Sequence, residues 1–104
     1  MSKLTIGDKC LQSYPDRIPI ILNYKNFHQD TVRKLLVPDQ TTIESVLVTV
    51  RRNIKLLHNE MLAVSIDGKT MSGSEIMTNL YHKHRDKYDG CLHLTIYKEN
   101  TDII

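Results

Sequence analysis

Few side chains in this chain of 104 residues have a type and spacing suited to catalysis or metal binding. His82 and His84 lie two positions apart, and on a helix two such side chains point about 200° apart around the axis. Their rings therefore do not converge on one metal ion. Cys10 and Cys91 match no zinc-binding spacing, and no nucleophile signature surrounds either of them. We expect no catalytic site, no metal and no cofactor, and we interpret both cysteines as reduced structural thiols.

The hydroxyl-rich segment Ser-Gly-Ser-Glu at 72–75 contains too little glycine for a loop that cradles a phosphate. A serine followed three residues later by glutamate is instead the pattern of a helix capping box. Thr41 and Glu44 have the same spacing. We therefore predict that a helix begins behind each of these two segments.

The composition is typical of one globular domain. The length fits a single core, and the apolar share of 40% and charged share of 25% indicate neither disorder nor a membrane protein. The apolar run at 18–22 is interrupted by Pro19 and is too short to span a bilayer. No charged-then-apolar leader opens the chain, so the expected compartment is the cytosol.

The net charge of +2 favours no particular partner. Basic residues cluster at 51–52 and at 83–87, but acidic residues are interleaved with them or follow them, so we interpret both clusters as solvated helix faces. No aromatic platform of the kind that binds single-stranded nucleic acid accompanies them. A small basic nucleic-acid-binding domain is the alternative from another class, and a steep salt dependence of binding would reveal it.

Hydrophobic periodicity predicts four strands. Residues 18–24 are β-branched and apolar, residues 35–37 form a short apolar run, and residues 62–66 and 92–97 alternate between apolar and polar. Pro19 removes one backbone donor, which favours an irregular or edge position for the first strand. Asp67-Gly68 is a strong signal for a tight turn.

The same periodicity predicts helices. Apolar residues recur at three- and four-residue steps over 43–54, and a second helix ends near His84. A short helix at 4–13 stands in front. The order predicts an α+β fold: a ubiquitin-like β-grasp with one mixed four-stranded sheet, two helices packed on it and a short N-terminal helix.

Five blocks of sequence carry a family resemblance. They are Tyr14-Pro15-Asp16-Arg17-Ile18-Pro19-Ile20-Ile21, Lys34-Leu35-Leu36-Val37-Pro38, Val50-Arg51-Arg52-Asn53-Ile54-Lys55-Leu56, Leu80-Tyr81-His82-Lys83-His84 and Asp89-Gly90-Cys91-Leu92, followed by Glu99-Asn100-Thr101. In order and nearly in spacing they resemble the autophagy ubiquitin-like modifiers, the GABARAP and microtubule-associated light-chain family. The resemblance implies a short helical extension at 1–13 and a ubiquitin-like domain at 14–104.

The resemblance also implies what the protein does. Members of this family are not enzymes but adaptors that bind peptides with an aromatic residue, two spacers and an aliphatic residue, often flanked by acids. The peptide adds a strand to a sheet edge, here the strand at 34–37. The implied partners are short linear motifs of autophagy receptors and proteins of the conjugation pathway. The implied location is the cytoplasm and the membranes of autophagosomes or other vesicles, and we expect a monomer that binds no nucleic acid.

The resemblance assigns residues to three parts of such a site. A first pocket, for the aromatic side chain, would comprise Ile6, Cys10, Pro19, Lys34, Leu36 and Cys91. A second pocket, for the aliphatic side chain, would comprise Leu35, Val37, Pro38, Val46 and Thr49. The acidic flank of the peptide would meet Arg17, Lys34 and Arg51. Core packing is the alternative explanation for each apolar member of these sets.

The end of the chain departs from the family pattern. Family members are conjugated to lipid through a C-terminal glycine, whereas this sequence has no glycine after Gly90 and ends Thr-Asp-Ile-Ile. That conjugation chemistry is therefore not expected for the chain as written. Either the protein is a non-conjugating relative that acts as a soluble interaction module, or its natural end is missing.

The pockets depart from the family pattern as well. Cys91 stands where the family has a phenylalanine, and Thr49 stands where it has an aliphatic residue. Asn53 replaces a basic residue, and Val32 falls in a run that is otherwise basic. We therefore expect a reduced affinity for strongly acidic peptides.

Overall fold

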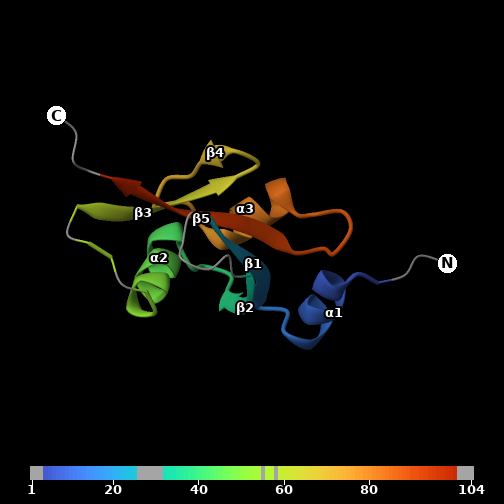
Figure 1. Cartoon of the computed structure of the whole chain (residues 1–104). Coiled ribbons are helices and arrows are strands. Elements are labelled where there is room, and N and C mark those ends of the chain that lie inside the picture. The colour runs from blue at the N-terminus through green and yellow to red at the C-terminus, as the bar shows by residue number, and fades with distance from the viewer. Residues whose placement is uncertain (1–3, 26–31, 55, 58, 101–104) are drawn as a thin grey trace.

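The computed structural model describes residues 4–25, 32–54, 56–57 and 59–100. The polar loop predicted at 26–31 and the tail at 101–104 lie outside the described residues. The elements in chain order are α1 (Ile6–Ser13), β1 (Arg17–Lys25), β2 (Val32–Pro38), α2 (Ile43–Arg52), β3 (Glu60–Ile66), β4 (Lys69–Thr70), α3 (Met77–His84) and β5 (Leu92–Asn100) (Figure 1). This arrangement confirms the predicted α+β, ubiquitin-like fold.

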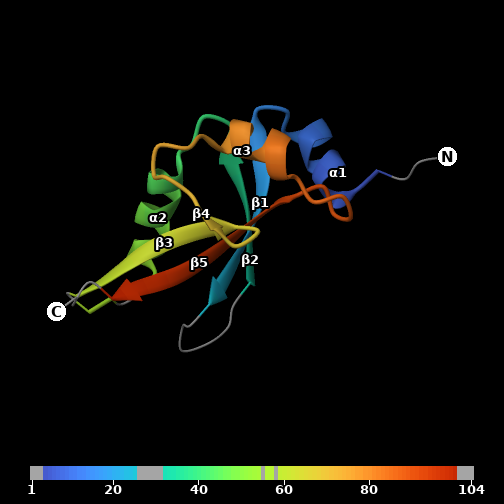
Figure 2. The same cartoon turned by 90° about the horizontal axis from the view of Figure 1, so that it is seen from above.

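One mixed sheet organises the molecule, with its strands in the order β2-β1-β5-β3-β4. β1 pairs antiparallel with β2 and parallel with β5, and β3 pairs antiparallel with β5. Figure 2 shows α2 and α3 over the same side of this twisted sheet. In this strand order β1 and β5, the first and last strands of the described residues, lie side by side within the sheet.

The core lies between the sheet and these two helices. Its members alternate along the strands, as side chains on one face of a sheet must, and recur along the helices. The most deeply buried large side chains are Ile20, Leu22, Ile43, Val50, Val64, Met77, Leu92, Leu94 and Ile96. The alternation predicted for residues 92–97 thus places its apolar half in the core.

Two details of the sheet differ from the sequence-based expectation. The sheet has a fifth strand, β4, because the predicted Asp67-Gly68 turn brings Lys69 back beside Ile66. Both turn residues have positive φ, 51° and 81°, as this tight hairpin requires. β1 is an internal strand, but its pairing with β5 begins only at Ile20. Pro19, one residue earlier, therefore pairs with β2 on one side and has no strand partner on the side of β5.

Both predicted capping boxes are misplaced. The residue that caps α2 is Thr42, not Thr41, and its hydroxyl accepts from the N–H of Ser45 at 3.2 Å. The 72–75 segment forms a turn, and α3 begins beyond it behind Ile76, which provides no side-chain cap. Backbone hydrogen bonds hold that end of α3 instead. In one of them the N–H of Met77 donates to the carbonyl of Thr41 at 2.8 Å.

The leading helix α1 has a true capping box, which the sequence reasoning missed. The Thr5 hydroxyl accepts from the N–H of Asp8, and the Asp8 carboxylate accepts from the N–H of Thr5, both at 3.0 Å.

Within the described parts of the chain, no helix has the length and apolar character needed to cross a membrane.

Candidate functional site

The edge strand β2 is the centre of the candidate site. Side chains of a strand point alternately to the two faces of its sheet. Lys34 and Leu36 pair with Ile21 and Pro19 of β1, so these residues share one face. The intervening residues of β2 point to the opposite face, toward α2. Each face of this edge is hollowed by a cavity.

The first cavity, called pocket 1 below, has a volume of about 350 Å³. All six residues assigned to the first pocket line it, together with four that the sequence reasoning missed. The full lining is Ile6, Cys10, Pro19, Ile20, Ile21, Lys34, Leu35, Leu36, Asp89 and Cys91. Helix α1, the sheet and the loop before β5 thus build one mainly apolar chamber.

The second cavity, called pocket 2, has a volume of about 250 Å³ and lies between β2 and α2. All five residues assigned to the second pocket line it. The full lining is Leu35, Val37, Pro38, Thr41, Ser45, Val46 and Thr49. The Thr49 hydroxyl donates to the carbonyl of Ser45 at 3.2 Å, so this polar group has a partner inside its own helix.

The three cations assigned to the acidic flank are not all beside the pockets. Lys34 is exposed and lines pocket 1. Arg17 begins β1, and its Nη1 donates to the carbonyl oxygen of Leu36 at 3.5 Å, which holds its charge beside β2. Arg51 lies exposed in the last turn of α2 and lines neither pocket.

The two thiols of the chain face the same cavity in different environments. Cys91 is buried, and its Sγ donates to the carbonyl of Asp89 at 3.6 Å. Burial, reinforced by the neighbouring Asp89 carboxylate, raises the pKa of the Cys91 thiol to about 11. Cys10 is half-buried on α1. Only the thiolate is strongly nucleophilic, so Cys91 is held in its unreactive form.

Alkylation with iodoacetamide at pH 8 should therefore modify Cys10 well before Cys91. With a pKa of about 11, only about one Cys91 in a thousand is a thiolate at pH 8. Site-resolved mass spectrometry of a time course measures both rates, and the same reaction in denaturant should bring them together. Equal rates in the folded protein would contradict this assignment, and raising the pH to 10 should accelerate Cys91.

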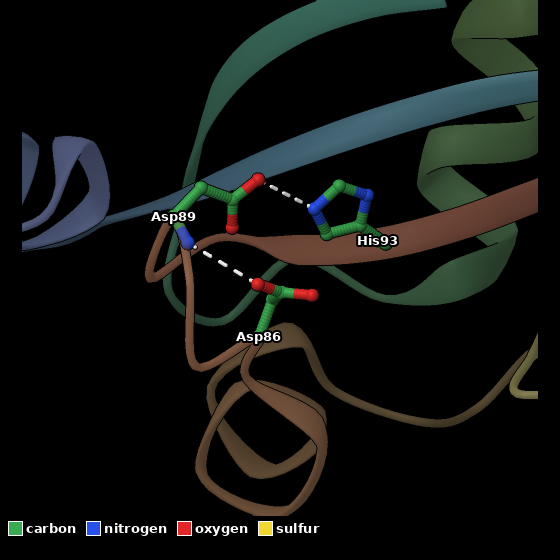
Figure 3. Close-up of side chains that lie close together, drawn as sticks. All are labelled: Asp86, Asp89 and His93. Atoms are coloured by element: carbon green, nitrogen blue, oxygen red, sulfur yellow. Dashed lines mark hydrogen bonds and ion pairs between the residues drawn. The ribbon is translucent and has the colours of Figure 1, made fainter.

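A cluster of potential ligand atoms lies beside pocket 1, which the sequence reasoning did not anticipate. Atoms of Asp86, Asp89 and His93 all lie within 4.8 Å of one another (Figure 3). Their spacing in the sequence, three and four residues apart across a turn, was the available signal.

Hydrogen bonds within the loop at 85–91, and one contact from that loop to His93 of β5, account for this cluster. Asp86 accepts from the N–H groups of Tyr88 and Asp89, at 2.7 and 3.1 Å, and these bonds lower its pKa. Asp89 Oδ1 accepts from the N–H of Cys91 at 2.9 Å, and its Oδ2 lies 2.6 Å from Nε2 of His93. The carboxylates shape the turn that leads into β5, and we assign them that structural role.

The comparison with known proteins agrees with the fold and the sequence blocks. The family model described as "Autophagy protein Atg8 ubiquitin like" matches residues 3–102, which is nearly the whole chain. The chain belongs to the Atg8 family. Its sequence-based placement among the autophagy ubiquitin-like modifiers is thereby confirmed.

Individual Atg8 proteins are similar over most of their length. Autophagy-related protein 8a of Arabidopsis thaliana is 30% identical over 104 residues, covering 96% of this chain and 84% of that protein. Autophagy-related protein 8 of Schizosaccharomyces pombe is 29% identical over 100 residues, covering 93% and 82%. The crystal structure of Trypanosoma brucei ATG8 matches with a TM-score of 0.76 and 26% identity, covering 91% of this chain and 84% of that one.

Proposed function

We propose that this protein is an autophagy adaptor that binds short aromatic-x-x-aliphatic peptides by strand addition at β2. The observation that carries the proposal is the edge strand itself, which has a mainly apolar cavity on each face. An edge strand offers unpaired backbone groups to an incoming chain. Main-chain hydrogen bonds would provide affinity, and the two pockets would provide specificity.

The geometry of an extended peptide explains the spacing of the motif. Neighbouring side chains of a strand alternate between faces, so residues i and i+3 point to opposite sides. They are also about 10 Å apart along the strand, at about 3.3 Å per residue. An aromatic residue entering pocket 1 therefore directs an aliphatic residue three positions later toward the face that carries pocket 2.

Charge around the edge supports acidic residues beside the motif. Lys34 lies at the rim of pocket 1 and Arg17 lies beside β2. Both are exposed, so each contact with a carboxylate would contribute at most about 1 kcal/mol. Arg51 is the weakest of the three candidates, because it lines neither pocket.

Membership of the Atg8 family supports the cellular part of the proposal. The protein would act in autophagosome or vesicle formation in the cytoplasm, in association with vesicle membranes. Its partners would be autophagy receptors and proteins of the conjugation machinery that carry such motifs. The role is one of recognition, and no step of catalysis is assigned to the chain.

Titration with an aromatic-x-x-aliphatic peptide tests the site directly. Amide chemical-shift changes in NMR spectra should concentrate at 18–21 and 34–37, since the peptide would pair with β2 and fill pocket 1 beside β1. A peptide with alanine at both key positions is the control and should produce little change. Changes confined to 51–52 or to 83–87 would place binding on another surface and overturn the proposed site.

A further inference from the structure

Helix α1 provides Ile6 and Cys10 to pocket 1 but buries little apolar surface of its own. Ile6 is 57% exposed, and among the eight residues of the helix only Gly7 is buried. An isolated helix of this length is not stable in water. Contacts with other parts of the chain must therefore hold the wall of pocket 1 in place.

Part of this support comes from β1 and the core, against which Leu11 packs half-buried, and part comes from the loop at 85–91. The N–H of Gly7 donates to the carbonyl of Asp89 at 2.7 Å. The approach is so close that a Cβ on Gly7 would overlap the carbonyl group of Gly90. Next along the helix, Asp8 accepts from the Thr5 N–H with one carboxylate oxygen and forms an ion pair with Arg85 through the other.

Arg85 is itself held from a second direction. It caps the C-terminus of α3, and its guanidinium lies 5.6 Å from the centre of the Tyr81 ring, a cation–π contact. The hydroxyl of Tyr81 donates to the carbonyl of Gly90 at 2.8 Å in a buried position. Hydrogen bonds from Thr5 and the contact with Arg85 lower the pKa of Asp8, which keeps this carboxylate charged.

We propose that Arg85 is a positioning residue for pocket 1, acting through Asp8 on α1. The inference rests on the proposed function of that pocket. Neither Arg85 nor Asp8 lines the cavity. Their ion pair fixes α1 before a peptide arrives, so the wall formed by Ile6 and Cys10 is preorganised and need not be ordered on binding.

The test uses Arg85→Gln and two peptides, one with an aromatic-x-x-aliphatic motif and one with alanine in place of the aromatic residue. The variant should lower the affinity for the first peptide by about three- to ten-fold. This is the effect expected for loss of one partly exposed ion pair and of the order that the pair imposes on α1. It should leave the affinity for the second peptide unchanged, because that peptide has no aromatic side chain to place in pocket 1. Calorimetric or fluorescence titration measures both.

Asp8→Asn should reproduce the effect, and combining it with Arg85→Gln should add little, because both remove the same interaction. Amide hydrogen exchange over 6–13 should become faster in each variant while that of β5 stays slow. Lys87→Gln is the matched control, since it removes an exposed charge of the same sign from the same loop and should change neither peptide.

The outcomes separate this inference from the function on which it rests. If the unaltered protein binds neither peptide, the proposed function fails. Suppose instead that the unaltered protein binds the aromatic peptide. If Arg85→Gln then lowers the affinity for both peptides equally, or for neither of them, Arg85 does not position pocket 1. An effect of Lys87→Gln equal to that of Arg85→Gln would show a general charge effect and would also overturn the inference.

Discussion

Replacing Leu36 by glutamate should abolish binding of an aromatic-x-x-aliphatic peptide while leaving the protein folded. Leu36 lies half-buried on the edge strand β2 and lines pocket 1. In the free protein the new carboxylate can remain in water. A bound aromatic side chain would cover it, and a buried charge without a partner is very costly. We expect a loss of about 100-fold or more, which corresponds to about 2.7 kcal/mol.

Met61→Glu is the matched control for this experiment. Met61 is 52% exposed and lies on β3, on the far side of β1 and β5 from β2. It adds the same charge to the same sheet, so it should change peptide affinity little. Titration and thermal unfolding of both variants separate binding from stability. Peptide affinity retained by a folded Leu36→Glu protein would exclude pocket 1 as the binding site.

Replacing Gly7 by alanine should destabilise α1, although the same change in an ordinary helix stabilises it by about 0.5–1 kcal/mol. The sign reverses because the new methyl group would overlap the backbone carbonyl of Gly90. To make room, α1 must move and lose its hydrogen bond to Asp89, which contributes about 1 kcal/mol. Pocket 1 then loses the wall formed by Ile6 and Cys10, and we expect peptide affinity to fall by about ten-fold or more.

Hydrogen exchange over 6–13 and peptide titration measure these two consequences. Gly73→Ala is the control, because a Cβ there would make only an ordinary contact, 3.5 Å from Cβ of Glu44. It should leave both measurements unchanged. If Gly7→Ala slowed exchange in α1 and kept full affinity, the close packing of α1 on the loop at 85–91 would not matter for the site.

Local pattern was enough to predict most elements of the fold. Alternation marked the strands that contain Leu62 and Leu92, and the Asp67-Gly68 pair marked a hairpin turn that the structure contains. The strand β4 was missed because it has two residues, both exposed, and therefore no alternation to detect. The cap of α2 was misplaced by one residue because Thr41 and Thr42 are adjacent hydroxyl residues and only the backbone geometry chooses between them.

The candidate site was predictable to a different degree in its different parts. The residues of β2 in both pockets followed from the family blocks, and the structure groups them as expected. The contribution of Asp89 and the anchoring of α1 were not predictable, because they depend on contacts between segments far apart in the sequence. A glycine inside a helix ordinarily indicates weakness, and only the proximity of Gly90 explains why Gly7 suits its position.

The central place of β5 has a consequence for the order in which the molecule assembles. A ribosome completes β1 and β2 early, but the other edge of β1, at Ile20, Ile21 and Leu22, pairs with Leu92, His93 and Leu94 of β5. Until β5 emerges, the apolar strand β1 has one edge without a partner, and an exposed strand edge of this kind is prone to aggregation. Contacts this distant in sequence also slow folding. A nascent chain stalled before Leu92 should therefore be held by chaperones and remain sensitive to protease, and resistance should appear only after Asn100 is made.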